Sequence, residues 1–281
     1  MHLGIFAKTF PGTSPADVLA QARAAGFAAV QYNMACSGLP SMPDDIPRDT
    51  AAAVSRAADD VGVAVVAVSG TYNMIHPDPA VRQQGLARLE ILARAAPLLG
   101  TSMITLCTGT RDAQDQWRHH PDNDSTAAWN DLLLEMGKAI HIAETYGVDL
   151  GVEPELANVV NSAVKARRLL DQVASPRLKI VLDPANLFEV ETPDRQRDIV
   201  AAAIDLLADR IALGHAKDRT ETGGFIAAGQ GVLDFHHYVT RLAAAGFAGA
   251  LVTHGLEAAD AGSVARFLSQ VLTDCGAGTP T

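Results

Sequence analysis

The chain of 281 residues contains 48% hydrophobic and 19% charged residues, a balance typical of a folded globular protein and not of a disordered one. Its formal net charge of −10 disfavours binding to nucleic acid and to anionic membranes. The three scattered cysteines form no CxxC pair, and no apolar run reaches the ~20 residues that span a bilayer. We therefore expect a cytoplasmic protein with no signal peptide, no membrane segment and no nucleic-acid partner.

Strand-like runs alternate with helical stretches along the whole chain. The strand-like runs are residues 2–8, 28–33, 63–70, 103–109, 149–155, 179–186, 211–218 and 249–257. The clearest helical stretches are residues 15–25, 79–99, 126–146 and 235–245. A glycine follows each of these stretches, which is typical of a helix C-cap. Because the strand-like runs are apolar throughout, they predict a parallel sheet that is covered on both faces.

Eight such units without a linker predict an α/β fold, a single (β/α)8 TIM barrel over residues 1–275. Residues 276–281 are expected to form a flexible C-terminal tail. An open, doubly wound sheet is the alternative arrangement. The longer connections at 33–45, 109–125 and 219–234 are expected to contribute to the functional site, because function concentrates in the loops at one end of this barrel.

Four runs in the second half of the chain end in an acid or an imidazole. These side chains are Glu153, Asp183, His215 and His254, in the motifs GVEPE, VLDPAN, GHAKD and VTHG. The ends of barrel strands meet at one face, so four oxygen and nitrogen donors would converge there. Such a set suits a divalent metal ion. Structural roles are the alternatives: a turn at Asp183 before Pro184, or a buried core position for His215.

These motifs resemble the sugar phosphate isomerase/epimerase family, the xylose isomerase-like TIM barrels. The similarity covers essentially the whole chain and is most specific at GVEPE, VLDPAN, GHAKD and GQGVLDF. It implies a metal held by Glu, Asp, His and Glu at the ends of strands five to eight. Glu153, Asp183 and His215 match this pattern. His254 stands at the position of the last glutamate, and Asn186 stands where the epimerases have a histidine.

The resemblance also implies the chemistry. A divalent-metal-dependent isomerase or epimerase removes a proton next to a carbonyl and forms a metal-stabilised enediolate. Glu153 would be the base, and His254 a ligand and second acid or base. One divalent ion is expected, with Mn²⁺ favoured among Mn²⁺, Mg²⁺, Co²⁺ and Zn²⁺, because the second imidazole lowers the negative charge of the site. The expected substrate is a sugar, an inositol derivative or a related hydroxy-carbonyl compound, and a homo-oligomer is left open.

Six further residues are candidate substrate ligands: Asn73, His76, Arg111, Glu155, Asn186 and Lys217. Strand alternation makes Lys217 point the same way as His215, and an ion pair with Asp183 or Glu153 is the alternative for Lys217. Arg111 suits bidentate binding of a phosphate or carboxylate, and a solvated loop arginine is its alternative.

Three other functions remain open at this point. A lyase similar to the inosose dehydratases would start from the same enediolate. Phosphodiester hydrolysis, as in the related endonuclease IV, needs a basic DNA-binding surface, and the net charge of −10 argues against it. A barrel that has lost catalysis and only binds a sugar is the third alternative, and His254 in place of the glutamate is the feature that favours it.

Overall fold

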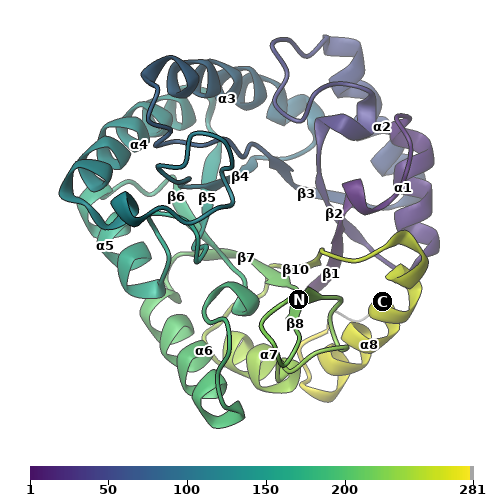
Figure 1. Cartoon of the computed structure of the whole chain (residues 1–281). Helices are drawn as coiled ribbons and strands as arrows, with labels where there is room; N and C mark the ends of the chain where they lie inside the picture. The colour runs from purple at the N-terminus through teal and green to yellow at the C-terminus, as the bar shows by residue number, and fades with distance from the viewer. Residues whose placement is uncertain (279–281) are drawn as a thin grey trace.

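Eight parallel strands close into a barrel in this computed structural model, and helices surround the barrel as an outer ring (Figure 1). The structure describes residues 1–278. Around the barrel the strands follow the order β1-β10-β7-β6-β5-β4-β3-β2. The predicted fold class, a single (β/α)8 TIM barrel, is confirmed, and the open doubly wound sheet is excluded because the first and last strands pair.

The elements fall close to the predicted runs. The barrel strands are β1 (His2–Phe6), β2 (Ala29–Tyr32), β3 (Ala64–Ser69), β4 (Met103–Cys107), β5 (Asp149–Glu153), β6 (Leu178–Leu182), β7 (Ile211–Ala216) and β10 (Ala250–Thr253). The helices are α1 (Pro15–Ala24), α2 (Arg48–Val61), α3 (Pro79–Leu99), α4 (Thr126–Tyr146), α5 (Ala163–Val173), α6 (Pro193–Leu207), α7 (Phe235–Ala244) and α8 (Ala261–Asp274). Short 3-10 turns are η1 (Ala7–Thr9), η2 (Met34–Ser37), η3 (Pro121–Asp124), η4 (Pro184–Asn186) and η5 (Ala258–Asp260).

Local sequence signals set the helix ends. Ser14 and Asp78 cap the N-termini of α1 and α3, because their side-chain oxygens accept hydrogen bonds from the Asp17 and Ala80 backbone amides. Gly100 ends α3 with φ of 84°, a conformation that L side chains rarely adopt. Helix α3 therefore stops shortly before β4 begins at Met103.

Small and branched side chains fill the interior of the barrel. This interior layer consists of Ala29, Ala67, Val181, Leu213, Ala250 and Val252. Gly151 belongs to the same layer, since an added Cβ there would lie 2.8 Å from Val181 Cγ2. Side chains alternate along a strand, so the residue two positions after each inward residue also points into the barrel, closer to the strand C-terminus. The interior layer thus forms the floor on which a site can be built.

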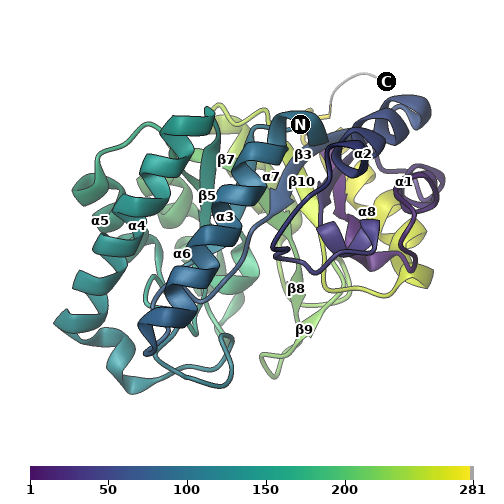
Figure 2. The ribbon, with the colours of Figure 1, turned by 90° about the horizontal axis from the view of Figure 1, so that it is seen from above.

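A small hairpin extends the end of the barrel that lies opposite the two chain termini (Figure 2). It pairs β8 (Asp218–Arg219) with β9 (Phe225–Ile226). The Asp218 carboxylate accepts hydrogen bonds from the backbone amides of Gly229, Gly231 and Leu233. The glycine-rich loop after β7 is therefore fixed to the barrel by one buried carboxylate.

The end of the chain continues from α8. Residues 276–278 donate backbone hydrogen bonds to Leu272 and Thr273. The remainder of the predicted flexible tail, 279–281, lies outside the described residues. Within residues 1–278, no helix combines the length and the apolar character needed to cross a membrane. Cys36, Cys107 and Cys275 are all unpaired.

The space around Gly151 predicts the effect of a single added methyl group. Gly151→Ala should lower the free energy of unfolding by about 1–3 kcal/mol, because its Cβ would meet Val181 Cγ2 at 2.8 Å and Met103 Sδ at 3.2 Å. Gly137→Ala is the matched control: no atom lies within 4 Å of its added Cβ at this exposed position of α4, and it should stabilise by about 0.5–1 kcal/mol. Chemical denaturation of both variants measures the difference. Equal effects would contradict the tight packing of the interior layer.

Candidate metal centre

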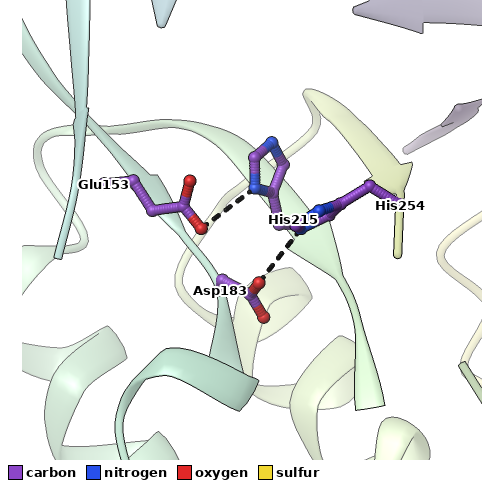
Figure 3. A group of neighbouring side chains, drawn as sticks. All are labelled: Glu153, Asp183, His215 and His254. Atoms are coloured by element: carbon purple, nitrogen blue, oxygen red, sulfur yellow. Dashed lines mark hydrogen bonds and ion pairs between the residues drawn. The ribbon is translucent and has the colours of Figure 1, made fainter. Parts of the chain in front are cut away.

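Four side chains from four strand ends meet at the C-terminal end of the barrel (Figure 3). They are Glu153, Asp183, His215 and His254, and one donor atom of each lies within 4.8 Å of the donor atoms of the other three. Glu153 ends β5, Asp183 and His254 directly follow β6 and β10, and His215 lies in β7. The sequence-predicted set of four is therefore brought together in the structure.

Strand alternation accounts for this convergence. Each member of the cluster follows an inward residue of the interior layer by two positions, namely Gly151, Val181, Leu213 and Val252. The four donors thus occupy the next level above the apolar interior. They form the floor of a pocket. The apolar interior layer lies directly beneath them and excludes water from that side.

The His215 ring is oriented from behind by an amide. Gln31 Nε2 donates to Thr105 Oγ1 at 3.1 Å, which turns Gln31 Oε1 towards His215. His215 Nε2 therefore donates to Gln31 Oε1, at 2.8 Å. In the neutral ring the Nδ1 lone pair then faces Glu153 Oε1, 3.2 Å away. Two facing acceptors at this distance need a cation between them or a protonated ring, and the orienting amide is the arrangement found behind metal-ligating histidines.

The Asp183 carboxylate is buried and surrounded by donors. Its Oδ1 accepts from the Ala185 amide at 2.9 Å, and its Oδ2 lies 3.1 Å from His254 Nε2 and 3.5 Å from Lys217 Nζ. Burial alone would raise its pKa, but the nearby Lys217 ammonium and His254 hold the pKa of Asp183 well below its usual range. Asp183 is therefore ionised at neutral pH and ready to bind a cation.

The two imidazoles lie against each other. Their ring centroids are 4.5 Å apart. Burial, together with the neighbouring His215, lowers the pKa of His254 despite its contact with Asp183. Burial opposes ionisation of Glu153 as well, but His215 lowers the pKa of that carboxyl overall. The cluster therefore contains two carboxylates and a neutral His254 at neutral pH.

A polar chain links the cluster to three of the predicted substrate ligands. Asn186 Nδ2 donates to Glu153 Oε1 and Glu155 Oε2, both at 2.7 Å, and Lys217 Nζ donates to Asn186 Oδ1 at 3.0 Å. The ion pair between Lys217 and Asp183, which the sequence left as an alternative, is present. Burial and the adjacent Glu153 raise the pKa of Glu155 to about 7. Glu155, Asn186 and Lys217 thus form the wall beside the four donors.

The donor set fits a divalent cation. Two carboxylates and two imidazoles are the ligand types that Mn²⁺, Co²⁺ and Zn²⁺ accept in proteins. The members of the cluster now interact with one another through the atoms that would face an ion, Glu153 with His215 and Asp183 with His254 (Figure 3). These four residues could hold a metal ion without further ligands from the chain.

The cluster opens into a polar pocket of about 490 Å³. Two successive levels of strand-end residues line it. The lower level includes Phe6, Gln31, Ser69, Glu153, His215 and His254, and the upper level includes Lys8, Asn33, Thr71, Glu155 and Lys217. Ser41, Gln116, Trp117 and Phe225 come from the surrounding loops. Trp117 and Phe225 are 54% and 50% exposed at the pocket mouth, and the Lys217 ammonium lies 3.7 Å from the Phe225 ring centroid.

Three predicted substrate ligands lie elsewhere. Arg111 pairs with Asp131 at 2.6 Å and donates to the Ile75 carbonyl, so its guanidinium group is already engaged in holding two loops together. Asn73 exchanges hydrogen bonds with the Thr110 backbone, and His76 contacts the Ala113 carbonyl. Asn73 and His76 line a neighbouring hollow instead of the pocket above the cluster. Their placement does not favour the prediction that these three residues bind substrate.

Several pocket residues were not predicted as site residues. Gln31 lies in β2, and Lys8 and Asn33 follow β1 and β2, two strands whose ends contain no acid or histidine. The available signal was positional, because these residues lie two or four positions after the inward residues Gly4 and Ala29. A search restricted to metal-ligating residue types could not find them.

The profile of the xylose isomerase-like TIM barrel family matches residues 19–271. The chain belongs to this family. No curated protein sequence matches this xylose isomerase-like barrel significantly. The predicted family membership is therefore confirmed by the profile and not by a characterised relative.

Solved structures similar to this xylose isomerase-like barrel include several sugar enzymes. The 3-keto-D-glucoside 4-epimerase of E. coli is 18% identical, with TM-score 0.74 and coverage of 97% of this chain and 99% of that chain. An L-ribulose 3-epimerase is 19% identical, with TM-score 0.77 and coverage of 98% of this chain and 95% of that chain. A probable 3-DHS dehydratase of Bacillus anthracis is 14% identical, with TM-score 0.74 and coverage of 97% of this chain and 99% of that chain. At these identities the similarity establishes the shared fold.

The raised pKa of Glu155 predicts a pH-dependent stability in metal-free protein. A pKa of about 7 in the folded state, against 4.5 unfolded, means that the folded protein binds more protons between these values. Wild type therefore loses stability from this group as pH rises from 5 to 8, whereas Glu155→Gln does not. The stability of Glu155→Gln relative to wild type should rise by about 2 kcal/mol over this range.

Urea denaturation of chelator-treated protein at pH 5 and pH 8 measures this change. Comparing the two pH values removes any effect of the substitution that does not depend on pH. The Gln side chain also keeps an oxygen that can accept from Asn186. A relative stability that is independent of pH would show that Glu155 is not desolvated beside Glu153.

Proposed function

We propose that this protein is a divalent-metal-dependent isomerase or epimerase that removes a proton next to the carbonyl of a sugar, an inositol derivative or a related hydroxy-carbonyl compound. The observation that supports this proposal best is the convergence of Glu153, Asp183, His215 and His254 on the floor of a polar pocket. A bound divalent ion would polarise a carbonyl oxygen and stabilise the negative charge that develops on it. Mn²⁺ remains the favoured ion because the site combines two carboxylates with two imidazoles.

Glu153 has the properties of the base. Its Oε1 contacts His215 and Asn186, while its Oε2 has no hydrogen-bond partner among residues 1–278. The carboxyl is ionised because its pKa is lowered, and its side chain lines the pocket. Oε2 is therefore available to accept a proton from a substrate carbon placed above the cluster.

His254 is the proposed second acid or base. It lies on the opposite side of the cluster from Glu153 (Figure 3). Its Nε2 contacts Asp183, and its Nδ1 has no hydrogen-bond partner within the described part of the chain, residues 1–278. Burial and His215 favour the neutral ring. If Nε2 binds the ion, the ring proton lies on Nδ1, so His254 would act as the acid that returns a proton to the substrate. A proton acceptor on one side of a substrate carbon and a proton donor on the other is the arrangement that epimerisation needs, because the proton leaves one face and returns to the other.

The neighbouring wall positions the substrate. Lys217 and Glu155 line the pocket, and Asn186 links them to Glu153. The Lys217 ammonium and the Glu155 carboxyl can bind hydroxyl groups of a polyol, while the buried Asn186 amide holds both in place. Trp117 and Phe225 at the mouth offer apolar faces for the C–H groups of the same molecule. These contacts favour a small polyhydroxylated substrate.

A dehydration is the second candidate reaction. It begins with the same proton removal and then expels a hydroxyl group from the next carbon, so the floor of the pocket serves both reactions. The similar solved structures include both epimerases and a probable dehydratase. Product analysis separates the two reactions, since only dehydration yields a product that has lost one water.

The remaining expectations belong to the same proposal. The structural neighbours that are named as sugar epimerases act on small molecules, and we propose a small sugar or polyol as the partner of this chain as well. The three unpaired cysteines agree with the proposed cytoplasmic location. A homo-oligomer and the absence of a nucleic-acid partner remain predictions from the sequence.

Deuterium exchange tests the proposed reaction. Protein supplied with Mn²⁺ and incubated in D₂O with a panel of ketoses, aldoses and keto-inositols should introduce deuterium at the carbon next to the carbonyl of at least one compound. Glu153→Gln should slow this exchange by about 10²–10⁴-fold, because the amide cannot accept the proton. Nuclear magnetic resonance of the recovered substrate measures the exchange.

Glu191→Gln, an exposed change before α6, is the control and should exchange like wild type. Exchange that persists in Glu153→Gln would contradict the role of Glu153. No exchange with any compound would contradict the proposed reaction class.

A further inference from the structure

The pocket has a chemically different end at β1 and β2. Lys8 lies in η1 after β1, Asn33 follows β2, and Ser41 lies in the next connection. All three side chains line the pocket above the cluster. We call these residues the donor recess, because each can donate a hydrogen bond through nitrogen or oxygen.

Sheet register places two of these residues side by side. Phe6 of β1 pairs with Gln31 of β2, and Lys8 and Asn33 follow this pair by two positions each. The Lys8 charge also acts on η2: burial raises the pKa of the Cys36 thiol to about 11, and the Lys8 ammonium opposes that rise. Lys8 therefore lies over the same part of the pocket rim as Asn33 and η2.

Asn33 is buried and has an unused donor. Only 4% of the residue is exposed. Its Oδ1 accepts from the Ala35 amide at 3.0 Å, which fixes the orientation of the amide group. Its Nδ2 has no hydrogen-bond partner among residues 1–278 and borders the pocket. The Nδ2 group faces the pocket and can therefore donate to a ligand atom that accepts a hydrogen bond.

Lys8 is a cation without a counter-charge. No carboxylate of residues 1–278 lies within 4.0 Å of its ammonium group, and it has no hydrogen-bond partner there. Lys217, the other pocket lysine, differs because it contacts Asp183 and Asn186. The ammonium of the exposed Lys8 therefore has all its hydrogens available for a ligand, whereas Lys217 already contacts Asp183 and Asn186.

Charge is distributed unevenly along the pocket. Glu153 and Glu155 both lie at the β5 side, and Asp183 lies beside them after β6. None of the described lining residues contributed by β1, β2, β3 and their connections is acidic. The chain as a whole has a net charge of −10, so most of its surface repels anions. The donor recess is thus a local exception beside the metal centre.

We infer that the substrate has an anionic group, a carboxylate or a phosphate, that binds Lys8, Asn33 and Ser41 while its hydroxy-carbonyl end lies at the cluster. This inference rests on the proposed function and specifies its substrate class as a sugar acid or a sugar phosphate. One anionic oxygen accepts from the buried Asn33 amide and another pairs with the Lys8 ammonium. A neutral sugar would supply no counter-charge to the exposed Lys8 ammonium.

Ligand binding tests this inference without relying on turnover. D-fructose, D-fructuronate and D-fructose 6-phosphate share one carbonyl end and differ in the group at the other end, which is neutral, a carboxylate or a phosphate. Titration calorimetry should be run on chelator-treated protein and on protein supplied with Mn²⁺. At least one anion should bind about tenfold more tightly than fructose, and high salt should weaken that preference. Comparison of the carboxylate with the phosphate identifies which anion the recess accepts.

Variants of Lys8 assign the preference to the recess. Lys8→Gln should abolish the preference for the anion over fructose, while Lys8→Arg should retain it. Arg23→Gln removes the same charge from the exposed last turn of α1, at the opposite end of the barrel, and should behave like wild type. A preference that survives in Lys8→Gln, equal affinity for all three ligands, or no measurable binding of either anion would overturn the inference.

These outcomes are separable from the proposed function. Anion preference without deuterium exchange would support the donor recess and reject the proposed reaction. Exchange on a neutral sugar without anion preference would support the reaction and reject the recess.

Discussion

The whole site depends on one geometric constraint, the alternation of side chains along strands that close into a barrel. Closure forces every second side chain into a shared interior, and the apolar interior layer fills it up to Val181 and Leu213. The next level, two residues further on, cannot be packed as tightly, because the barrel opens to solvent there. Polar side chains at that level converge from all sides, which places Asp183 and His215 in contact distance of their partners.

Burial gives this convergence its chemical character. Ionised carboxylates against a hydrocarbon floor are costly unless cations or donors surround them, and here Lys217 and His254 contact Asp183 while His215 contacts Glu153. A divalent ion would add positive charge between the two carboxylates. The same argument explains why His215 is oriented by Gln31 from behind, since a fixed ring leaves its Nδ1 lone pair facing the position between the carboxylates.

The sequence predicted much of the fold and the centre of the site, because both follow from short-range patterns. Strand alternation and residue type were sufficient to find Asp183 and His215. Side-chain pairs between distant segments could not be predicted from such patterns. Arg111 forms an ion pair with Asp131 on α4, a partner that no local pattern indicates. The role of Lys8 was missed for the opposite reason, since its significance lies in the absence of a partner within residues 1–278, which only the folded structure reveals.

Metal titration tests the central claim most directly, that the four strand-end side chains form one divalent metal site. Calorimetry of Mn²⁺ with chelator-treated wild type should give about one equivalent bound, and Asp183→Asn should weaken binding by about 10–100-fold or more. Asp194→Asn, with a side chain 91% exposed on α6, should bind like wild type. Saturable binding that is unchanged in Asp183→Asn, or no binding by wild type, would contradict the account.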